Sequence, residues 1–157
     1  MVERKEERAM KMKENNYSGH VKVRIATMSE IYNDLYRAFL SELGLDTARS
    51  FSCDCQGEIV FIAQDEVGEV LGLASYFVPD QFLHILYVVP KARRTEVGTE
   101  ILKAIQRNFG ILFRLKCLTS NTSAKAFYLA LGFKVTANGT TSDGDYETLE
   151  INHSLIG

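Results

Sequence analysis

The sequence predicts a mixed α/β domain, and three observations support this class. Short runs rich in β-branched and aromatic residues alternate with stretches in which apolar residues recur every three to four positions. Three strand-like runs follow one another in the first half, which favours antiparallel pairing, and two strand-helix connections follow in the second half, which favours some parallel pairing. A chain of 157 residues with 46% hydrophobic residues fits one domain with a substantial core.

The chain divides into a charged N-terminal extension, residues 1–19, and a single domain, residues 20–157. The extension alternates Lys and Arg with Glu and carries little apolar surface, so we expect a solvated segment. Its start lacks the apolar core of a secretory signal, and no apolar run reaches the roughly 18 residues of a membrane span. These features predict a soluble, cytoplasmic protein without a membrane partner.

The first elements of the domain are a strand and a helix. Val21, Val23 and Ile25 alternate with polar residues, which predicts a half-buried strand. Thr27 and Glu30 then form the pattern of a capping box at the start of a helix. The apolar face of that helix consists of Ile31, Leu35, Phe39 and Leu43. The stretch 44–57 predicts a short second helix with a loop.

Three strands follow. Residues 58–65 and 69–78 read as two strands joined by a hairpin turn at Val67 and Gly68. Residues 82–89, FLHILYVV, are almost wholly apolar, which indicates a strand in the centre of the sheet. This strand ends at Pro90.

The second half alternates helices and strands. A helix is predicted where Val97, Ile101, Ile105 and Phe109 recur every four residues, and a strand over 111–118. Residues 120–133 form a second helix that stops at Gly132, a suitable left-handed terminator. The apolar face of that helix consists of Ala124, Phe127, Tyr128 and Leu131. Two last strands, within 133–137 and 146–155, flank the polar loop NGTTSDGD.

Charge and cysteine content exclude several classes of protein. A net charge of -2 and a pI near 5.9 give no general basic surface, which does not favour a nucleic-acid partner. The three cysteines Cys53, Cys55 and Cys117 are an odd set without the spacing of a disulfide framework, as in a reducing compartment. No nearby Cys/His pair completes a four-ligand set, so we expect ordinary thiols and no metal.

The segment 91–102, KARRTEVGTEIL, has the composition of an anion-binding loop at a helix start. Arg93 and Arg94 supply positive charge, and Gly98 allows a ligand to approach the backbone. Glu96 opposes this interpretation, because a carboxylate beside a diphosphate is repulsive. A capped helix with a charged start explains the same residues, so the segment alone leaves both interpretations open.

Two segments together resemble the GNAT superfamily of acyl-CoA-dependent N-acyltransferases: LYVVPKARRTEVGTEIL, residues 86–102, and NTSAKAFYLALGF, residues 121–133. The family loop reads Arg or Gln, two variable residues, Gly, one variable residue, then Gly or Ala. Arg93 and Gly98 match, whereas Glu96 replaces the first glycine. The element order agrees with the family over about residues 21–154.

The resemblance implies acetyl-CoA as cofactor and a set of residues that bind it. In the family the loop donates backbone N–H groups to the CoA pyrophosphate, and the end of the central strand pairs with the pantetheine amides. The implied cofactor-binding residues are Leu86, Tyr87, Val88, Arg93, Arg94, Thr95, Glu96, Val97, Gly98, Thr99, Asn121, Ala124 and Tyr128.

Two residues are implied as catalytic. Tyr128 stands where the family carries a tyrosine facing the thioester sulfur, and a phenol can protonate a leaving thiolate. His84 lies where several members carry a glutamate that deprotonates the attacking ammonium, and an imidazole titrating near neutrality suits that task. From the residues alone, Tyr128 also fits a packed aromatic and His84 a hydrogen-bonded core histidine.

The resemblance implies transfer of an acetyl group to a primary amine by direct attack. The acceptor is a small-molecule amine, or a lysine or N-terminal amine; acidic loop residues, which are Asp46, Asp54, Asp143, Asp145 and Glu147, would attract a cationic amine. A catalytically inactive binding module of the same fold is one alternative. An acyltransferase acting on a protein or on charged tRNA is another, and a homodimer is an assembly that the resemblance leaves open.

Overall fold

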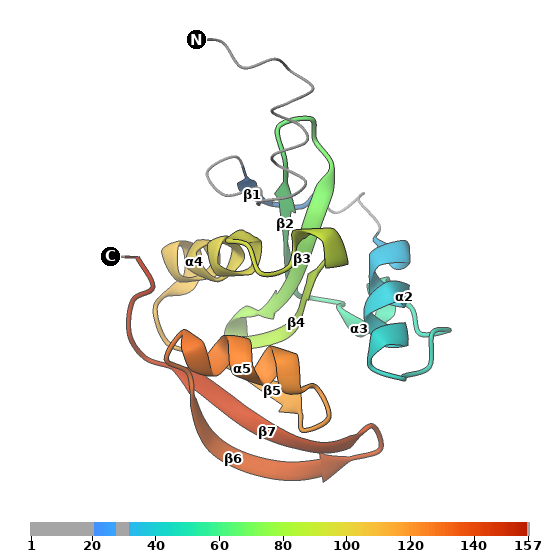
Figure 1. The fold of residues 1–157 in the computed structure, drawn as a ribbon, viewed down its shortest axis with the longest axis vertical. Helices are drawn as coiled ribbons and strands as arrows, with labels where there is room; N and C mark the ends of the chain where they lie inside the picture. Colours follow the sequence, from blue (N-terminus) through green and yellow to red (C-terminus); the bar gives the residue numbers. More distant parts are fainter. Residues whose placement is uncertain (1–20, 28–31, 157) are drawn as a thin grey trace.

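A single seven-stranded sheet organises the chain in the computed structural model, which describes residues 21–27 and 32–156 (Figure 1). The strand order is β1-β2-β3-β4-β5-β7-β6, and among the described strands only β4 and β5 pair in parallel. The strands are β1 (Lys22–Ile25), β2 (Ile59–Gln64), β3 (Val70–Phe77), β4 (Phe82–Val88), β5 (Phe113–Leu118), β6 (Lys134–Thr141) and β7 (Gly144–Ile151). The predicted mixed α/β class and the central place of the FLHILYVV strand are confirmed.

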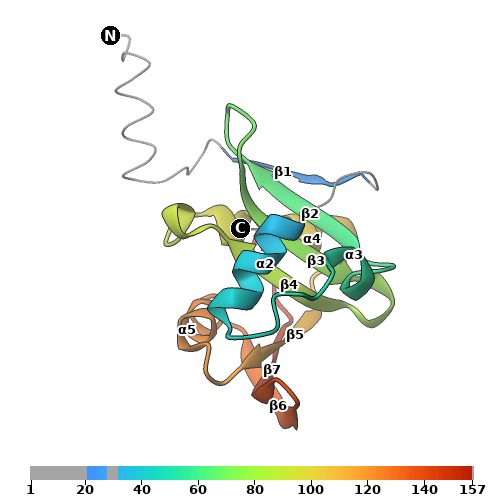
Figure 2. The ribbon, with the colours of Figure 1, turned by 90° about the vertical axis from the view of Figure 1, so that its right-hand side faces the viewer.

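Helices cover both faces of the sheet, and each face has its own core. The helices are α2 (Asn33–Glu42), α3 (Phe51–Asp54), α4 (Val97–Phe109) and α5 (Thr122–Ala130), with short 3₁₀ turns at Val78–Asp80 and Pro90–Ala92. One core lies beneath α4 and α5, and a second, smaller core lies beneath α2 and α3. Figure 2 shows α2 and α3 in front of the sheet with α4 behind it. In the described part of the chain, no helix is long and apolar enough to cross a membrane.

The two helices of the second half form as predicted. Val97, Ile101 and Ile105 of α4 are fully buried against the sheet, and the helix ends at Gly110, whose φ is 106°. This φ is one that glycine adopts at no steric cost. Burial of the predicted four-residue repeat therefore explains both the length of α4 and its orientation on the sheet.

The side chain of Asn121 begins α5 by accepting a hydrogen bond from the backbone N–H of Ala124 at 3.4 Å. The helix ends beside Gly132, which has a φ of 94°, so the predicted left-handed terminator is confirmed. The ring of His153 lies directly over this glycine, and an added Cβ would stand 2.5 Å from its Cε1. Any other residue at 132 would meet both the strained φ and this contact.

The N-terminal predictions are tested only in part. The charged extension, residues 1–19, and Glu30 of the predicted capping box lie outside the described residues. Helix α2 begins at Asn33 and has no side-chain hydrogen bond at its N-cap, Tyr32. The predicted short helix within 44–57 is confirmed as α3, which Ser50 caps through the N–H of Cys53.

The C-terminal hairpin departs from the prediction. The predicted eight-residue loop NGTTSDGD was wrong, because β6 continues to Thr141 and β7 starts at Gly144, which leaves positions 142 and 143 as the turn. Almost every residue of β6 is exposed, so no apolar alternation marks this strand in the sequence. Strand β7 also inserts between β5 and β6, so the second strand-helix connection does not create a parallel neighbour.

Candidate functional site

A cavity opens where the two central strands stop pairing. Strands β4 and β5 are in register only at Phe82 with Arg114 and at Leu83 with Leu115. Beyond these pairs a cavity of about 1130 Å³ lies between β4, α5 and the loop before α4. We call it the wedge cavity; among the residues lining it are Leu86, Tyr87, Val88, Arg93, Arg94, Thr95, Gly98, Asn121, Ala124 and Tyr128. A crevice at diverging strands of a mixed sheet is a common place for a ligand.

A β-bulge in β4 precedes this opening. Ser75 pairs with Ile85 and Tyr76 pairs with Leu83, so His84 has no cross-strand partner in β3. Such an extra residue bends the strand and changes the direction of its side chain. His84 therefore does not line the wedge cavity and instead extends on the face of the sheet covered by α2 and α3, which we call the α2–α3 face.

The loop before α4 is held by its own side chains. Thr95 donates its hydroxyl to the carbonyl of Ala92 at 2.5 Å and accepts from the N–H of Val97 at 3.2 Å. Arg94 adopts a φ of 60°, the left-handed region that non-glycine residues rarely enter. Because the first N–H groups of a helix lack intrahelical partners, the start of α4 offers donors to an anion in the wedge cavity.

The two arginines of this loop differ in their contacts. Arg93 donates from Nε to the carbonyl of Val88 at 2.9 Å and from Nη2 to Glu42 at 2.7 Å, and its guanidinium stacks over the ring of Tyr87. Tyr87 in turn donates to Glu42 at 2.7 Å. Arg94 makes no hydrogen bond or ion pair with any residue in the described part of the chain. Arg93 is therefore held in the cavity wall by protein contacts, whereas the guanidinium of Arg94 has no partner among the described residues.

Tyr128 is among the residues that line the wedge cavity. Its side chain is 7% exposed and packs edge-on against Phe127 and Phe133. Within the described residues its hydroxyl has no hydrogen-bond partner. Burial, reinforced by the nearby Cys117, raises the pKa of Tyr128 above its ordinary value. The phenol therefore remains protonated through the neutral range and can act as a donor.

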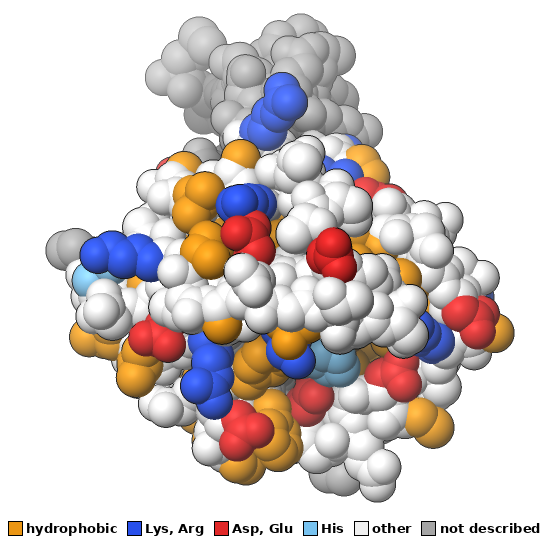
Figure 3. All heavy atoms as spheres, turned by 90° about the horizontal axis from the view of Figure 1, so that it is seen from below, with side chains coloured by type: hydrophobic (Ala, Val, Ile, Leu, Met, Phe, Trp, Pro, Cys, Tyr) orange, Lys and Arg blue, Asp and Glu red, His pale blue; other side chains and the backbone are white. Residues whose placement is uncertain are grey.

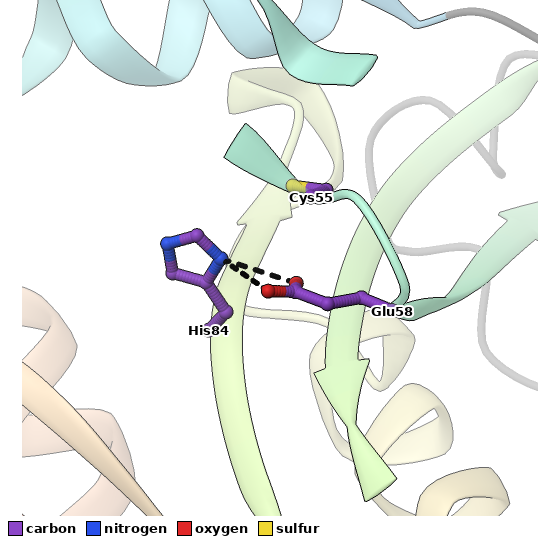
Figure 4. A group of neighbouring side chains, drawn as sticks. All are labelled: Cys55, Glu58 and His84. Atoms are coloured by element: carbon purple, nitrogen blue, oxygen red, sulfur yellow. Dashed lines mark hydrogen bonds and ion pairs between the residues drawn. The ribbon is translucent and has the colours of Figure 1, made fainter. Parts of the chain in front are cut away.

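Three side chains meet on the α2–α3 face (Figure 4). His84 approaches the carboxylate of Glu58 with its Nδ1 at 2.9 Å, and the sulfur of Cys55 lies close by. Ser75 donates its hydroxyl to the same carboxylate. Hydrogen bonding to Cys55 and to Glu58 raises the pKa of His84 to about 10, against an opposing effect of burial. The expectation that His84 titrates near neutrality is therefore wrong.

The acidic residues predicted to attract an amine already have partners. Asp54 accepts from the hydroxyl of Tyr36, Asp143 pairs with Arg49, Glu147 pairs with Lys125, Asp145 accepts from Thr140, and Asp46 accepts from the N–H of Ala48. Figure 3, viewed from the β6–β7 end, shows basic and acidic side chains interspersed over the surface. Of the five carboxylates, Asp143 and Glu147 are paired with a cation, whereas the other three accept hydrogen bonds from neutral groups and keep their charge.

A family model described as an acetyltransferase (GNAT) domain matches residues 56–135. The chain belongs to the GNAT acetyltransferase family. The matched range runs from Gln56 to the first residues of β6. It includes every residue that lines the wedge cavity except those of α2 and the loop after it. Comparison with curated protein sequences gives no match.

Solved GNAT structures share the fold at low sequence identity. A GNAT family acetyltransferase from Elizabethkingia anophelis with acetyl-CoA bound has a TM-score of 0.64 and 17% identity, covering 87% of this chain and 100% of that one. Spermidine N-acetyltransferase from Vibrio cholerae, in complex with CoA and spermine, has a TM-score of 0.66 and 15% identity, with coverage of 85% and 96%. Ard1 from Thermoplasma volcanium has a TM-score of 0.64 and 20% identity, with coverage of 86% and 99%.

Most cofactor-binding residues expected from the GNAT motifs line the wedge cavity, but three do not. Val97 is fully buried in the core, Thr99 is half-buried, and Glu96 is exposed away from the lining. Glu96 has a φ of -82°, so the position of the missing family glycine requires no left-handed backbone. Neither backbone conformation nor steric crowding therefore excludes a glutamate here.

Gly98 has a second reason to be glycine. An added Cβ would stand 3.0 Å from Cζ of Phe127, so close packing of α4 on α5 requires a small residue. Sequence reasoning missed this contact and also missed Glu58 and Cys55 as neighbours of His84. The only local signal was the three-residue spacing of Cys55 and Glu58, which does not reveal their approach to a strand 26 residues further on.

Proposed function

We propose that residues 20–157 form one domain that transfers an acetyl group from acetyl-CoA to a primary amine by direct attack. The observation that carries the proposal is the wedge cavity itself. It joins an unpaired guanidinium, the open end of β4 and a phenol without a partner in the described chain. Family membership and the CoA-bound relatives support the same cofactor.

The residues of the wedge cavity fit CoA. Its volume of about 1130 Å³ lies just above the range of about 300–1000 Å³ usual for drug-sized ligands, as an elongated cofactor requires. Arg94 and the N–H groups at the start of α4 would hold the diphosphate. The backbone of Leu86 and Tyr87 would pair with the pantetheine amides, while the carbonyl of Val88 already accepts from Arg93. Bound acetyl-CoA would supply the activated thioester carbonyl.

Tyr128 is the proposed general acid. Its hydroxyl reaches the cavity from a buried ring, and its raised pKa keeps the proton on the phenol until a thiolate develops. Because it has no protein acceptor in the described chain, forming a new hydrogen bond to the leaving sulfur breaks none of those described. His84 does not suit the base role, because hydrogen bonding to Cys55 and Glu58 raises its pKa to about 10 and keeps the ring protonated at neutral pH; we propose that the amine attacks in its neutral form and releases its proton to solvent.

The acceptor class is proposed as a primary amine without a requirement for several positive charges. Arg49 and Lys125 neutralise Asp143 and Glu147, which gives little support to selection of a polycation. A lysine side chain or an N-terminal amine of a protein satisfies the same chemistry as a small amine. The alternatives are a binding module without catalysis and an acyltransferase acting on tRNA.

Calorimetric titration of the purified protein with acetyl-CoA, and separately with CoA, tests the proposal. We expect binding in the micromolar range for both ligands, about -8 kcal/mol. Absence of heat at millimolar ligand would contradict the cofactor assignment. Binding without acetylation of a panel of small amines, peptides and aminoacyl-tRNA would favour the non-catalytic module.

A further inference from the structure

Cys55, Glu58 and His84 come from three separate elements and converge on the α2–α3 face. Cys55 caps the C-terminus of α3, Glu58 immediately precedes β2, and His84 is the bulge residue of β4. One ligand-type atom from each, sulfur, carboxylate oxygen and ring nitrogen, lies within 4.8 Å of the other two. Figure 4 shows the three side chains directed at a common point.

The donor types favour one class of ion. Thiolate and imidazole suit zinc and its neighbours in the first transition row, and a carboxylate is a common third ligand. Calcium and magnesium prefer oxygen ligands alone, so a sulfur donor does not suit them. Thiolate and carboxylate together also balance the charge of a divalent ion, which permits a largely buried site.

The spacing fits a tetrahedral ion with small adjustments. Bonds of about 2.0–2.3 Å place tetrahedral ligand atoms roughly 3.3–3.6 Å apart. His84 Nδ1 lies 2.9 Å from a carboxylate oxygen of Glu58, so these two atoms would move apart by about half an ångström. The sulfur of Cys55 lies within 4.8 Å of both ligand atoms and would move toward them. Rotamer changes of one or two side chains supply shifts of this size.

Neighbouring groups already orient the ligands and leave one side accessible. The hydroxyl of Ser75, which is fully buried, fixes the Glu58 carboxylate by donating to it. Cys55 is 6% exposed and the Glu58 side chain 10%, whereas the His84 side chain is 37% exposed. An ion would therefore reach the site past His84, and a fourth position would remain for water or for a substrate atom.

We propose that Cys55, Glu58 and His84 bind a divalent transition-metal ion of the zinc type. The ion takes the place of the direct contact between His84 and Glu58. His84 cannot use Nδ1 for a metal and also keep its bond to Glu58, so the metal-bound and metal-free arrangements of the cluster exclude one another. The proposal is otherwise independent of acetyl transfer, since binding of the ion requires neither CoA nor an amine.

Titration of the metal-free, full-length protein with Co²⁺ tests the proposal, because cobalt reports its ligands in its absorption spectrum. We expect one equivalent to bind, with a thiolate-to-cobalt charge-transfer band and visible bands of tetrahedral intensity. Zn²⁺ should displace the cobalt and remove both sets of bands. No uptake of Co²⁺ or Zn²⁺ at millimolar concentration, or a spectrum without the thiolate band, would overturn the proposal.

Variants locate the ion. Cys55→Ser should abolish the thiolate band and weaken Co²⁺ binding by more than about 100-fold. Ser75→Ala should weaken Co²⁺ binding by about tenfold, because it removes only the group that orients Glu58. The double variant Cys53→Ser/Cys117→Ser is the matched control and should bind like the wild type, since neither thiol belongs to the cluster. A band that survives Cys55→Ser, or one that the control loses, would place the metal elsewhere and overturn the proposal.

Discussion

The wedge cavity and the α2–α3 face differ in how many of their polar groups already have protein partners. At the wedge cavity, Arg94 and the hydroxyl of Tyr128 have none among the residues that the structure describes. On the α2–α3 face, Glu58 contacts His84 and Ser75, and Asp54 accepts from Tyr36 at 2.5 Å.

This difference distinguishes groups that are available to bind a ligand from groups that stabilise the folded protein. A polar group in a cavity that has no protein partner exchanges only water for a ligand, so its contribution appears in binding or turnover. A group that already has a partner must break that bond first, so its removal changes mainly stability. The substitutions below test this separation from the largest expected effect to the smallest.

Tyr128→Phe should reduce kcat by about 100-fold or more, the usual contribution of a general acid. The aromatic ring stays, so the packing against Phe127 and Phe133 and the affinity for CoA should change little. Steady-state kinetics and calorimetry on the same preparation measure both quantities. An equal loss of kcat and of CoA affinity would show that the hydroxyl supports the site without acting as the acid.

Arg94→Gln should weaken CoA binding about tenfold, because one charge-assisted bond to the diphosphate is lost. The affinity of the wild type should also fall more steeply with salt than that of the variant, since a solvent-accessible charge is screened. Arg107→Gln is the matched control, because Arg107 is an exposed arginine in the last turn of α4, remote from the loop. Equal affinities for all three proteins would remove Arg94 from the site.

Asp143→Asn should lower the free energy of unfolding by about 0.5 kcal/mol at pH 7, as expected for a partly exposed ion pair. Arg49 holds the pKa of Asp143 below its usual value, so the stabilisation is present above the unfolded aspartate pKa of about 3.9. It is lost as the pH falls through the lower folded value. Urea unfolding of wild type and variant should therefore converge in acid.

Arg49→Gln and the double variant complete a thermodynamic cycle for this pair. If the two side chains interact only with one another, the double variant Arg49→Gln/Asp143→Asn should have the same free energy of unfolding as either single variant. A large loss of CoA affinity in Asp143→Asn would contradict the assignment of this residue to the fold.

Glu96→Gly should leave CoA affinity unchanged or slightly tighter, the smallest effect of the series. The glutamate is exposed, does not line the wedge cavity and makes no side-chain cap to α4. Calorimetry with CoA provides the measurement. A clear weakening would show that Glu96 supports the loop, and the backbone freedom of the new glycine would be tested by Glu96→Ala.

Much of the fold was predictable because it is encoded by local periodicity. The repeat through Val97, Ile101 and Ile105 predicted α4, and Gly132 predicted the end of α5. The exposed strand β6 was not predictable beyond its first residues, because a strand that buries neither face has no alternation to detect. The GNAT motifs likewise predicted most of the residues that line the wedge cavity.

The remaining features depend on tertiary structure. Glu42 of α2 pairs with Arg93 and so leaves Arg94 as the available arginine of the loop, although Glu42 lies more than fifty positions before Arg94 in the sequence. The role expected of His84 changed because the bulge in β4 directs it toward Glu58 and Cys55. No pattern within a short window contains these contacts, since each joins elements that only the sheet order brings together.

The sequence by itself determined the order of helices and strands, the family, and the composition of the loop before α4. Tertiary structure alone decided that Glu58 and Asp54 on the α2–α3 face have hydrogen-bond partners and that three ligand-type atoms meet beside β4. It also decided that Arg94 and the hydroxyl of Tyr128 have no partner among the described residues. The physical reason is that helix and strand formation depend on neighbours three or four residues away. Charge pairing and ligand geometry instead depend on a strand bulge and on contacts such as Arg49 with Asp143, across 94 residues.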